Sequence, residues 1–184
     1  MRASNPGRSV LVLGGARSGK SRFALELGRA TPGRRVFVAT CRVDPDDAEM
    51  VARVAAHRAR RDGSWSTIEE SLDLGERLES LSREYDVLVV DCLTLWLANL
   101  LDRGEPDAAV DRRLRCLTEA IASVRSRIVL VTNEVGMGIV PVTPLGRAFR
   151  DWQGLVNQAV AEAVDDVYAL TAGLAQRLKP MGVA

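Results

Sequence analysis

Short runs of apolar residues alternate with longer amphipathic segments along most of this chain. The runs contain almost no polar residue and are four or five residues long. Such runs, without polar alternation, are typical of strands covered on both faces, as in a parallel sheet flanked by helices. The predicted strands are Val10–Leu13, Val36–Ala39, Val87–Val90, Ile128–Thr132 and Val167–Leu170.

The segments between these runs space their apolar residues as helices do. A Gly-Glu-Pro loop at 104–106 separates two of them. Neither a repeat nor a linker divides the chain, so we expect one P-loop nucleotide-binding domain over residues 1–184, with residues 1–8 as a tail. The alternation predicts an α/β fold of three layers, α/β/α, with nucleotide at the carboxyl ends of a mostly parallel sheet. The predicted helices are Lys20–Ala30, Asp46–Arg61, Leu72–Arg83, Leu93–Leu101, Ala108–Ser123 and Leu145–Val164.

Composition narrows the class of protein. The 184 residues are 47% hydrophobic and 27% charged, and the net charge of +1 gives no case for a nucleic-acid partner. Cys41, Cys92 and Cys116 are widely spaced and lack a zinc-binding pattern, as expected of reduced cytosolic thiols. Residues 1–8 lack the apolar stretch of a signal peptide, and no run approaches the ~18 apolar residues that span a bilayer. We expect a soluble, cytoplasmic protein without a membrane span.

The segment directly after the first apolar run carries the most informative motif. It is a P-loop pattern followed by the start of an amphipathic helix. Its glycines allow backbone N–H groups to turn inward and cradle phosphate oxygens, and its lysine can reach the β- and γ-phosphates. A glycine-rich turn with a chance Lys-Ser is the weaker interpretation. The predicted phosphate-binding residues are Gly14, Gly15, Ala16, Arg17, Ser18, Gly19, Lys20 and Ser21.

Acidic and amide side chains follow two other predicted strands. Asp91 ends one strand, where a carboxylate can hold Mg²⁺ together with the Ser21 hydroxyl. It could instead, or in addition, cap the helix that begins near Leu93. Asn133 and Glu134 likewise follow directly after a later predicted strand. They could orient a nucleophile or sense phosphate, or simply cap the loop.

His57 is the only histidine, and it lies in a predicted helix among arginines. Arg53 comes one turn before it, and Arg60 and Arg61 come one turn after. The apolar side of this helix is formed by other residues, so the Arg/His face points elsewhere. It is either a solvated face or a nucleophile kept neutral by nearby positive charge, with arginines that hold the polyphosphate it attacks. The apolar side comprises Met50, Val51, Val54 and Ala55.

A helical segment near the C-terminus carries a polar stripe. Arg150, Gly154, Asn157 and Gln158 fall at helical spacing, and Gly154 would let another backbone approach closely. An ordinary amphipathic helix with an exposed polar face fits the same pattern.

The chain resembles the bifunctional adenosylcobinamide kinase/adenosylcobinamide-phosphate guanylyltransferase family of cobalamin biosynthesis. The resemblance spans most of the chain and is most specific at Thr132–Pro141. It implies a RecA-like fold, phosphorylation of adenosylcobinamide by ATP or GTP, and then transfer of GMP from GTP with release of pyrophosphate. Further segments that carry it are 14–21, Ala39-Thr40, Glu49-Met50 with Arg53 and His57, Trp65-Ser66-Thr67 with Glu69, and Arg150-Asp151 with Gly154 and Asn157-Gln158.

The resemblance also implies roles for individual residues. His57 would form a guanylyl-histidine intermediate, Lys20 and Asp91 would be catalytic, and Mg²⁺ would be the cofactor. It further implies a homo-oligomer, a trimer, with the histidine-bearing helix near a subunit interface. Besides the phosphate loop, the implied nucleotide contacts are Ala39, Thr40, Cys41, Arg58, Ala59, Arg60, Glu69 and Asp91.

The chain departs from the family pattern at two positions. Some members carry two adjacent histidines where this chain has Ala56 and His57, and relatives can have Glu where it has Asp91. There are therefore two single-activity alternatives. One is a P-loop small-molecule kinase, and the other is an enzyme that retains only guanylyl transfer. A non-catalytic nucleotide switch is a third alternative, but it would need no nucleophile.

Overall fold

The computed structural model describes residues 8–42, 46, 48–59, 61–104 and 106–179. They form one seven-stranded sheet in the order β3-β2-β4-β5-β1-β6-β7. The strands are β1 (Ser9–Gly14), β2 (Arg35–Ala39), β3 (Trp65–Glu69), β4 (Val87–Asp91), β5 (Arg127–Val131), β6 (Asp166–Thr171) and β7 (Leu174–Lys179). The helices are α1 (Lys20–Arg29), α2 (Ala48–Ala59), α3 (Leu74–Leu81), α4 (Leu93–Asp102), α5 (Asp107–Ser123) and α6 (Pro144–Ala163).

The sheet is parallel except at one edge. β1 pairs with β5 and β6, and β4 pairs with β2 and β5, all in parallel. Only β7 runs antiparallel, after a tight turn at Ala172 and Gly173 that joins it to β6. The predicted α/β architecture with a mostly parallel sheet is confirmed, and the five predicted strands are the five central ones.

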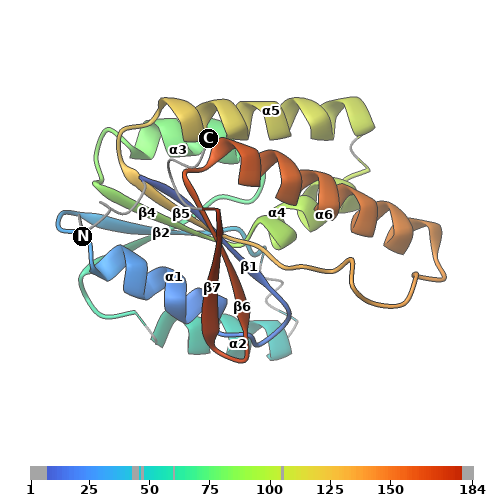
Figure 1. The fold of residues 1–184 in the computed structure, drawn as a ribbon, viewed down its shortest axis with the longest axis horizontal. Helices are drawn as coiled ribbons and strands as arrows, with labels where there is room; N and C mark the ends of the chain where they lie inside the picture. The colour runs from blue at the N-terminus through green and yellow to red at the C-terminus, as the bar shows by residue number, and fades with distance from the viewer. Residues whose placement is uncertain (1–7, 43–45, 47, 60, 105, 180–184) are drawn as a thin grey trace.

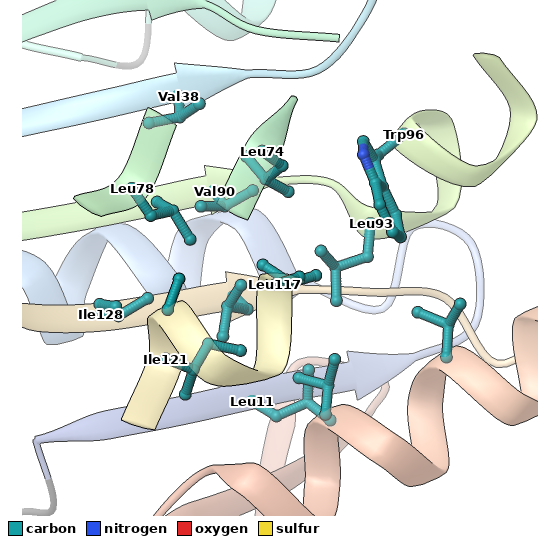
Figure 2. Close-up of a cluster of buried hydrophobic side chains, with 14 of the residues drawn as sticks. Leu11, Val38, Leu74, Leu78, Val90, Leu93, Trp96, Leu117, Ile121 and Ile128 are labelled. Atoms are coloured by element: carbon teal, nitrogen blue, oxygen red, sulfur yellow. The ribbon is translucent and has the colours of Figure 1, made fainter. Parts of the chain in front are cut away.

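Helices cover both faces of this sheet. Figure 1 shows α1 and α2 below the sheet and α3, α5 and α6 above it. On the upper face, Leu11 and Val90 of the sheet pack with Leu93, Trp96 and Leu117 of the helices in one buried cluster (Figure 2). Because both faces bury apolar side chains, the central strands need continuous apolar runs, as the sequence pattern predicted.

Two edge strands and several helix ends differ from the sequence-based expectation. β3 and β7 were not predicted as strands because their side chains are mostly exposed, so they lack an apolar run. Arg8, the last residue of the expected tail, donates a hydrogen bond to the Ala122 carbonyl at 3.4 Å, and residues 1–7 lie outside the described residues. Among the described residues, no helix is both long enough and apolar enough to cross a membrane.

Candidate nucleotide-binding and catalytic site

The phosphate loop lies between the end of β1 and the start of α1. Gly14 packs so closely against β6 that a Cβ there would collide with the Leu170 carbonyl oxygen. Gly19 caps α1 with a φ of 97°, and a Cβ there would lie 3.3 Å from the Cα of Gly173. Both positions therefore require glycine, and the loop rests on the end of β6 and the turn that follows.

Lys20 and its neighbours line this loop. The Lys20 ammonium is buried and donates a hydrogen bond to the Gly15 carbonyl oxygen at 2.5 Å. Burial lowers the pKa of Lys20, while the charges of Cys92 and Asp91 act in the opposite direction. Ser18 is buried beside Lys20, and Ser21 is half-buried in the first turn of α1. The predicted lysine and serine thus lie at the helix end where phosphate oxygens would sit.

Asp91 lies at the carboxyl end of the parallel strands, as the phosphate loop does. It pairs in register with Val131 of β5, which in turn pairs with Val12 of β1. Its Oδ2 atom is buried and has no hydrogen-bond partner among the described residues. The N-cap of α4 is Cys92, so the expectation that Asp91 caps this helix is wrong. An unpartnered buried carboxylate oxygen fits a hard cation such as Mg²⁺, for which Ser21 is the second predicted ligand.

Two of the predicted contacts at the end of β2, Ala39 and Thr40, lie beside Asp91. Ala39 pairs with Asp91 across the sheet, and Cys41 is half-buried. The Thr40 hydroxyl donates to the Cys92 carbonyl oxygen at 2.7 Å and accepts from the Cys92 N–H at 2.8 Å. Asn99 donates to the Thr40 carbonyl oxygen at 2.8 Å. Thr40 therefore joins the end of β2 to the start of α4 rather than offering a free hydroxyl.

The predicted histidine helix, α2, is attached to the end of β3. The Arg58 guanidinium lies 2.8 Å from the Glu69 carboxylate, so two predicted nucleotide contacts meet. His57 and Ala59 belong to α2, but their side chains lie outside the described part of the structure, as does all of Arg60.

Much of the apolar side of α2 is uncovered within this chain. Val51 and Ala55 are exposed and Val54 is half-buried, while the Met50 side chain lies outside the described part. Among the described side chains, the apolar side predicted from the sequence does not form a buried helix face.

Arg61 is a further cationic group on this side of the sheet. Its guanidinium lies 4.0 Å from the centroid of the Phe37 ring. Burial lowers the pKa of Arg61, the charge of Arg58 lowers it further, and Asp91 raises it. Arg61 was predicted only as a neighbour of His57. Its contact with Phe37 places its guanidinium over β2, the strand that pairs with β4.

The segment after β5 contacts the phosphate loop directly. The Glu134 N–H donates to the Gly14 carbonyl oxygen at 3.2 Å. The Glu134 carboxylate accepts from the Gly136 N–H at 2.6 Å, which is the loop-capping arrangement. The Asn133 N–H donates to the Thr94 hydroxyl at 2.9 Å.

A buried polar network holds this segment against α6. The Gln153 amide donates to the Thr132 hydroxyl at 3.0 Å and to the Asn157 amide oxygen at 2.9 Å. Asn157 in turn donates to the Asn133 carbonyl oxygen at 3.1 Å. Gln153 is fully buried, and sequence reasoning missed it because a glutamine on an amphipathic helix suggests an exposed position.

The polar stripe on α6 is only partly the expected one. Arg150 is half-buried and pairs with Asp151 at 3.6 Å, whereas Gln158 is exposed. A Cβ at Gly154 would meet no described atom within 4 Å, so the expected close approach of another backbone does not occur within the described chain.

Solved structures that share the fold include a bacterial ATPase and a protein from Pyrococcus horikoshii. The chain superposes on an ATPase of a bacterial type III secretion system with a TM-score of 0.53 and 14% identity, covering 89% of this chain and 51% of that one. A protein from Pyrococcus horikoshii OT3 matches with a TM-score of 0.55 and 11% identity, covering 96% and 89%. At such identities the likeness shows the fold alone, and it agrees with a three-layer P-loop NTPase.

Sequence comparison identifies the family. The model of the family described as cobinamide kinase/cobinamide phosphate guanyltransferase matches residues 10–178. The bifunctional adenosylcobalamin biosynthesis protein CobP of Pseudomonas aeruginosa is 43% identical over 92% of this chain and 96% of its own length. CobU of Escherichia coli K12 is 37% identical over 92% and 99%. The chain is an enzyme that belongs to the cobinamide kinase/cobinamide phosphate guanyltransferase family.

Proposed function

We propose that this enzyme catalyses both reactions of its family on adenosylcobinamide. In the first, ATP or GTP phosphorylates the hydroxyl of the aminopropanol arm. In the second, GMP from GTP is joined to that phosphate, giving adenosylcobinamide-GDP and pyrophosphate. One observation carries the proposal: a phosphate loop with a buried lysine lies at the same end of the parallel strands as Asp91, whose Oδ2 atom is buried and has no hydrogen-bond partner among the described residues.

In the kinase step, the acceptor hydroxyl releases its proton to solvent and its oxygen bonds to the γ-phosphorus. The bond from that phosphorus to its bridging oxygen breaks, and the electron pair leaves with the nucleoside diphosphate. Lys20 and the backbone N–H groups of the loop neutralise charge that develops on the phosphate oxygens. Asp91 and Ser21 would hold Mg²⁺, which supplies further neutralisation of phosphate charge when bound.

For guanylyl transfer, we propose His57 as the nucleophile. Its ring nitrogen would attack the α-phosphorus of GTP and release pyrophosphate, and the corrinoid phosphate would then displace the histidine. Arg58 and Glu69, joined by an ion pair, lie on the same side of the sheet as Asp91 and support a nucleotide position there. No other histidine is available in the chain, so this step depends on His57.

Incubation with α-labelled GTP tests the covalent step. The wild type should acquire a label that is lost in acid and kept in base, as a phosphorus–nitrogen bond behaves. His57→Ala should not label, whereas Arg112→Ala, an exposed position on α5, should label like the wild type. Equal labelling of wild type and His57→Ala would exclude this intermediate.

Ala56 beside His57 favours a second candidate, a kinase that has lost guanylyl transfer. The two are separated by incubating the pure enzyme with adenosylcobinamide, ATP, GTP and Mg²⁺ and resolving the products. A phosphorylated corrinoid without any GDP-linked product or pyrophosphate would establish the single-activity enzyme.

We also propose a cytoplasmic homotrimer. Its interface would use the exposed apolar side chains that follow β5, which the described chain leaves uncovered. Met137, Ile139 and Val142 are 91%, 97% and 92% exposed. A solution mass of three chains by light scattering is expected, and a monomer at all concentrations would contradict it.

A further inference from the structure

A cavity of about 580 Å³ lies beside the phosphate loop, on the side away from Asp91. Its size is within the range of small-molecule sites. The Gly173 N–H donates to the Ser18 carbonyl oxygen at 3.0 Å, which fixes the β6–β7 turn against the loop. The cavity therefore opens directly from the segment that would hold phosphates. Its lining residues are Arg17, Ser18, Gly19, Arg22, Leu25, Arg29, Ala172 and Gly173.

The lining has the chemistry of a purine nucleoside site. The Arg17 guanidinium is exposed and has no ion-pair or hydrogen-bond partner among the described residues. Within the part of the chain that the structure describes, the Arg22 side chain makes only an exposed ion pair with Glu26 at 3.7 Å, and Leu25 adds apolar surface. Guanidinium groups stack on aromatic rings and donate hydrogen bonds to purine acceptors, and they attract an attached polyphosphate.

The sheet order separates this cavity from the other predicted nucleotide contacts. The cavity lies on the β6–β7 side of β1, whereas Thr40, Glu69 and Asp91 follow or end strands on the β4–β2–β3 side. A triphosphate in the loop can thus extend its nucleoside in either of two directions. The direction decides which phosphorus is presented to the reactants.

A nucleoside in the cavity directs the γ-phosphate away from it, toward Asp91 at the end of β4. This is the orientation that phosphoryl transfer needs. A nucleoside on the opposite side instead brings the α-phosphate toward α2 and leaves the β- and γ-phosphates in the loop, as guanylyl transfer with release of pyrophosphate needs.

We propose that the cavity between α1 and the β6–β7 turn binds the purine nucleoside of the phosphoryl donor, and that the guanylyl donor binds in the opposite orientation. One phosphate loop then serves both reactions from two nucleoside positions. This inference rests on the proposed function. It adds a binding site formed by Arg17, Arg22 and the Ala172–Gly173 turn.

Paired ligands test the site. The dissociation constants of ATP and of inorganic tripolyphosphate are measured by calorimetry for the wild type, Ala172→Trp and Arg22→Gln. Ala172 is exposed and already holds a side chain at a φ of 51°, so tryptophan there fills the cavity from its rim. Arg112→Gln on α5 is the matched control, since it removes one exposed arginine from another element.

Loss of contacts to the nucleoside should weaken the binding of ATP but not the binding of tripolyphosphate. We expect the ATP dissociation constant of Ala172→Trp to rise about tenfold or more, with tripolyphosphate changed less than about twofold. Arg22→Gln should raise the ratio of the two constants by a smaller factor, and Arg112→Gln should leave it unchanged. In turnover, the KM for ATP should rise while labelling by α-labelled GTP is kept.

The proposal would be overturned if the variants bound both ligands equally more weakly, or if their affinity for ATP did not fall. Either result would leave the proposed reactions intact. Photolabelling with 8-azido-ATP gives an independent readout. The label is expected on peptides from α1 or the β6–β7 turn, and a label on the ends of β2 and β4 would overturn the proposal. If the wild type binds neither ATP nor tripolyphosphate, the phosphate-loop function itself fails as well.

Discussion

The Arg58 guanidinium lies 2.8 Å from the Glu69 carboxylate, and this ion pair joins α2 to the end of β3. Both side chains are more than half exposed, so the pair contributes only about 0–1 kcal/mol to folding. An ion pair this weak can open at little cost when a triphosphate competes for the arginine.

Removing Arg58 should therefore affect chemistry more than stability. We expect Arg58→Ala to lower the rate of labelling by α-labelled GTP about tenfold or more, because a phosphate-binding cation is lost. The free energy of unfolding in urea should fall by less than about 1 kcal/mol. Arg112→Ala is the control for loss of an exposed arginine, and wild-type labelling by Arg58→Ala would contradict the nucleotide position on this side.

Asp91→Asn should separate activity from stability in the same way. The Asp91 Oδ2 atom has no hydrogen bond to lose among the described residues, so the free energy of unfolding should change by less than about 1 kcal/mol. Kinase activity should fall about 100-fold and need more Mg²⁺, since the carboxylate charge is removed. Activity and denaturation are measured beside Asp102→Asn, an exposed control. Unchanged activity would remove Asp91 from the site.

The network at Gln153 predicts the opposite pattern, a loss of stability. Gln153→Leu removes the amide that donates to the Thr132 hydroxyl and to the Asn157 amide oxygen, and of these two acceptors only the Asn157 oxygen keeps a buried donor, the Thr132 hydroxyl at 2.7 Å; we expect a cost of about 1–3 kcal/mol. A double-mutant cycle with Asn157→Leu should give a coupling of about 0.5–3 kcal/mol. Gln158→Leu, exposed on the same helix, should change stability by less than about 0.5 kcal/mol. Additive effects of Gln153→Leu and Asn157→Leu would contradict the network.

Asp165 gives a prediction for acid pH. Burial raises the pKa of its carboxyl, but hydrogen bonds from the Ser9 N–H and hydroxyl, at 2.8 and 3.0 Å, more than offset this, so the pKa is lowered. A carboxyl with a lowered pKa in the folded protein stabilises it above the ordinary value of about 3.9. That contribution is lost as the pH falls below this value.

We therefore expect Asp165→Asn to flatten the loss of stability below about pH 4 relative to the wild type. Denaturation at a series of pH values measures this, with Asp102→Asn as the control. An identical acid profile for Asp165→Asn and the wild type would contradict the assignment.

The central sheet and the phosphate loop were predictable because one local rule governs each. A strand covered on both faces needs an apolar run, as at 87–90, and a phosphate nest needs glycines before Lys20. The same rules failed at the edges of the sheet. β3 and β7 expose most of their side chains, so nothing in their pattern separates them from loops.

The parts of the site that the sequence missed depend on tertiary contacts. Gln153 looks like a surface residue until α6 is packed beside Thr132. The hydrogen bonds of the Thr40 hydroxyl could not be predicted either, because their partner is Cys92, far away in sequence. Val51 shows the opposite case, an apolar residue that looks buried from the sequence but is exposed. Periodicity reveals which side of a helix is apolar, but not whether another part of the chain covers that side.

The two hydrogen bonds between Thr40 and Cys92 tie the ends of β2 and β4 into one rigid unit. The segment that leads to α2 departs from this unit, and so does the helix that follows Asp91. The backbone after Asp91 and the end of β2 are therefore held at a fixed distance from one another by a single hydroxyl group. The strand that ends in Asp91 is thus coupled to the strand from which the chain continues toward α2.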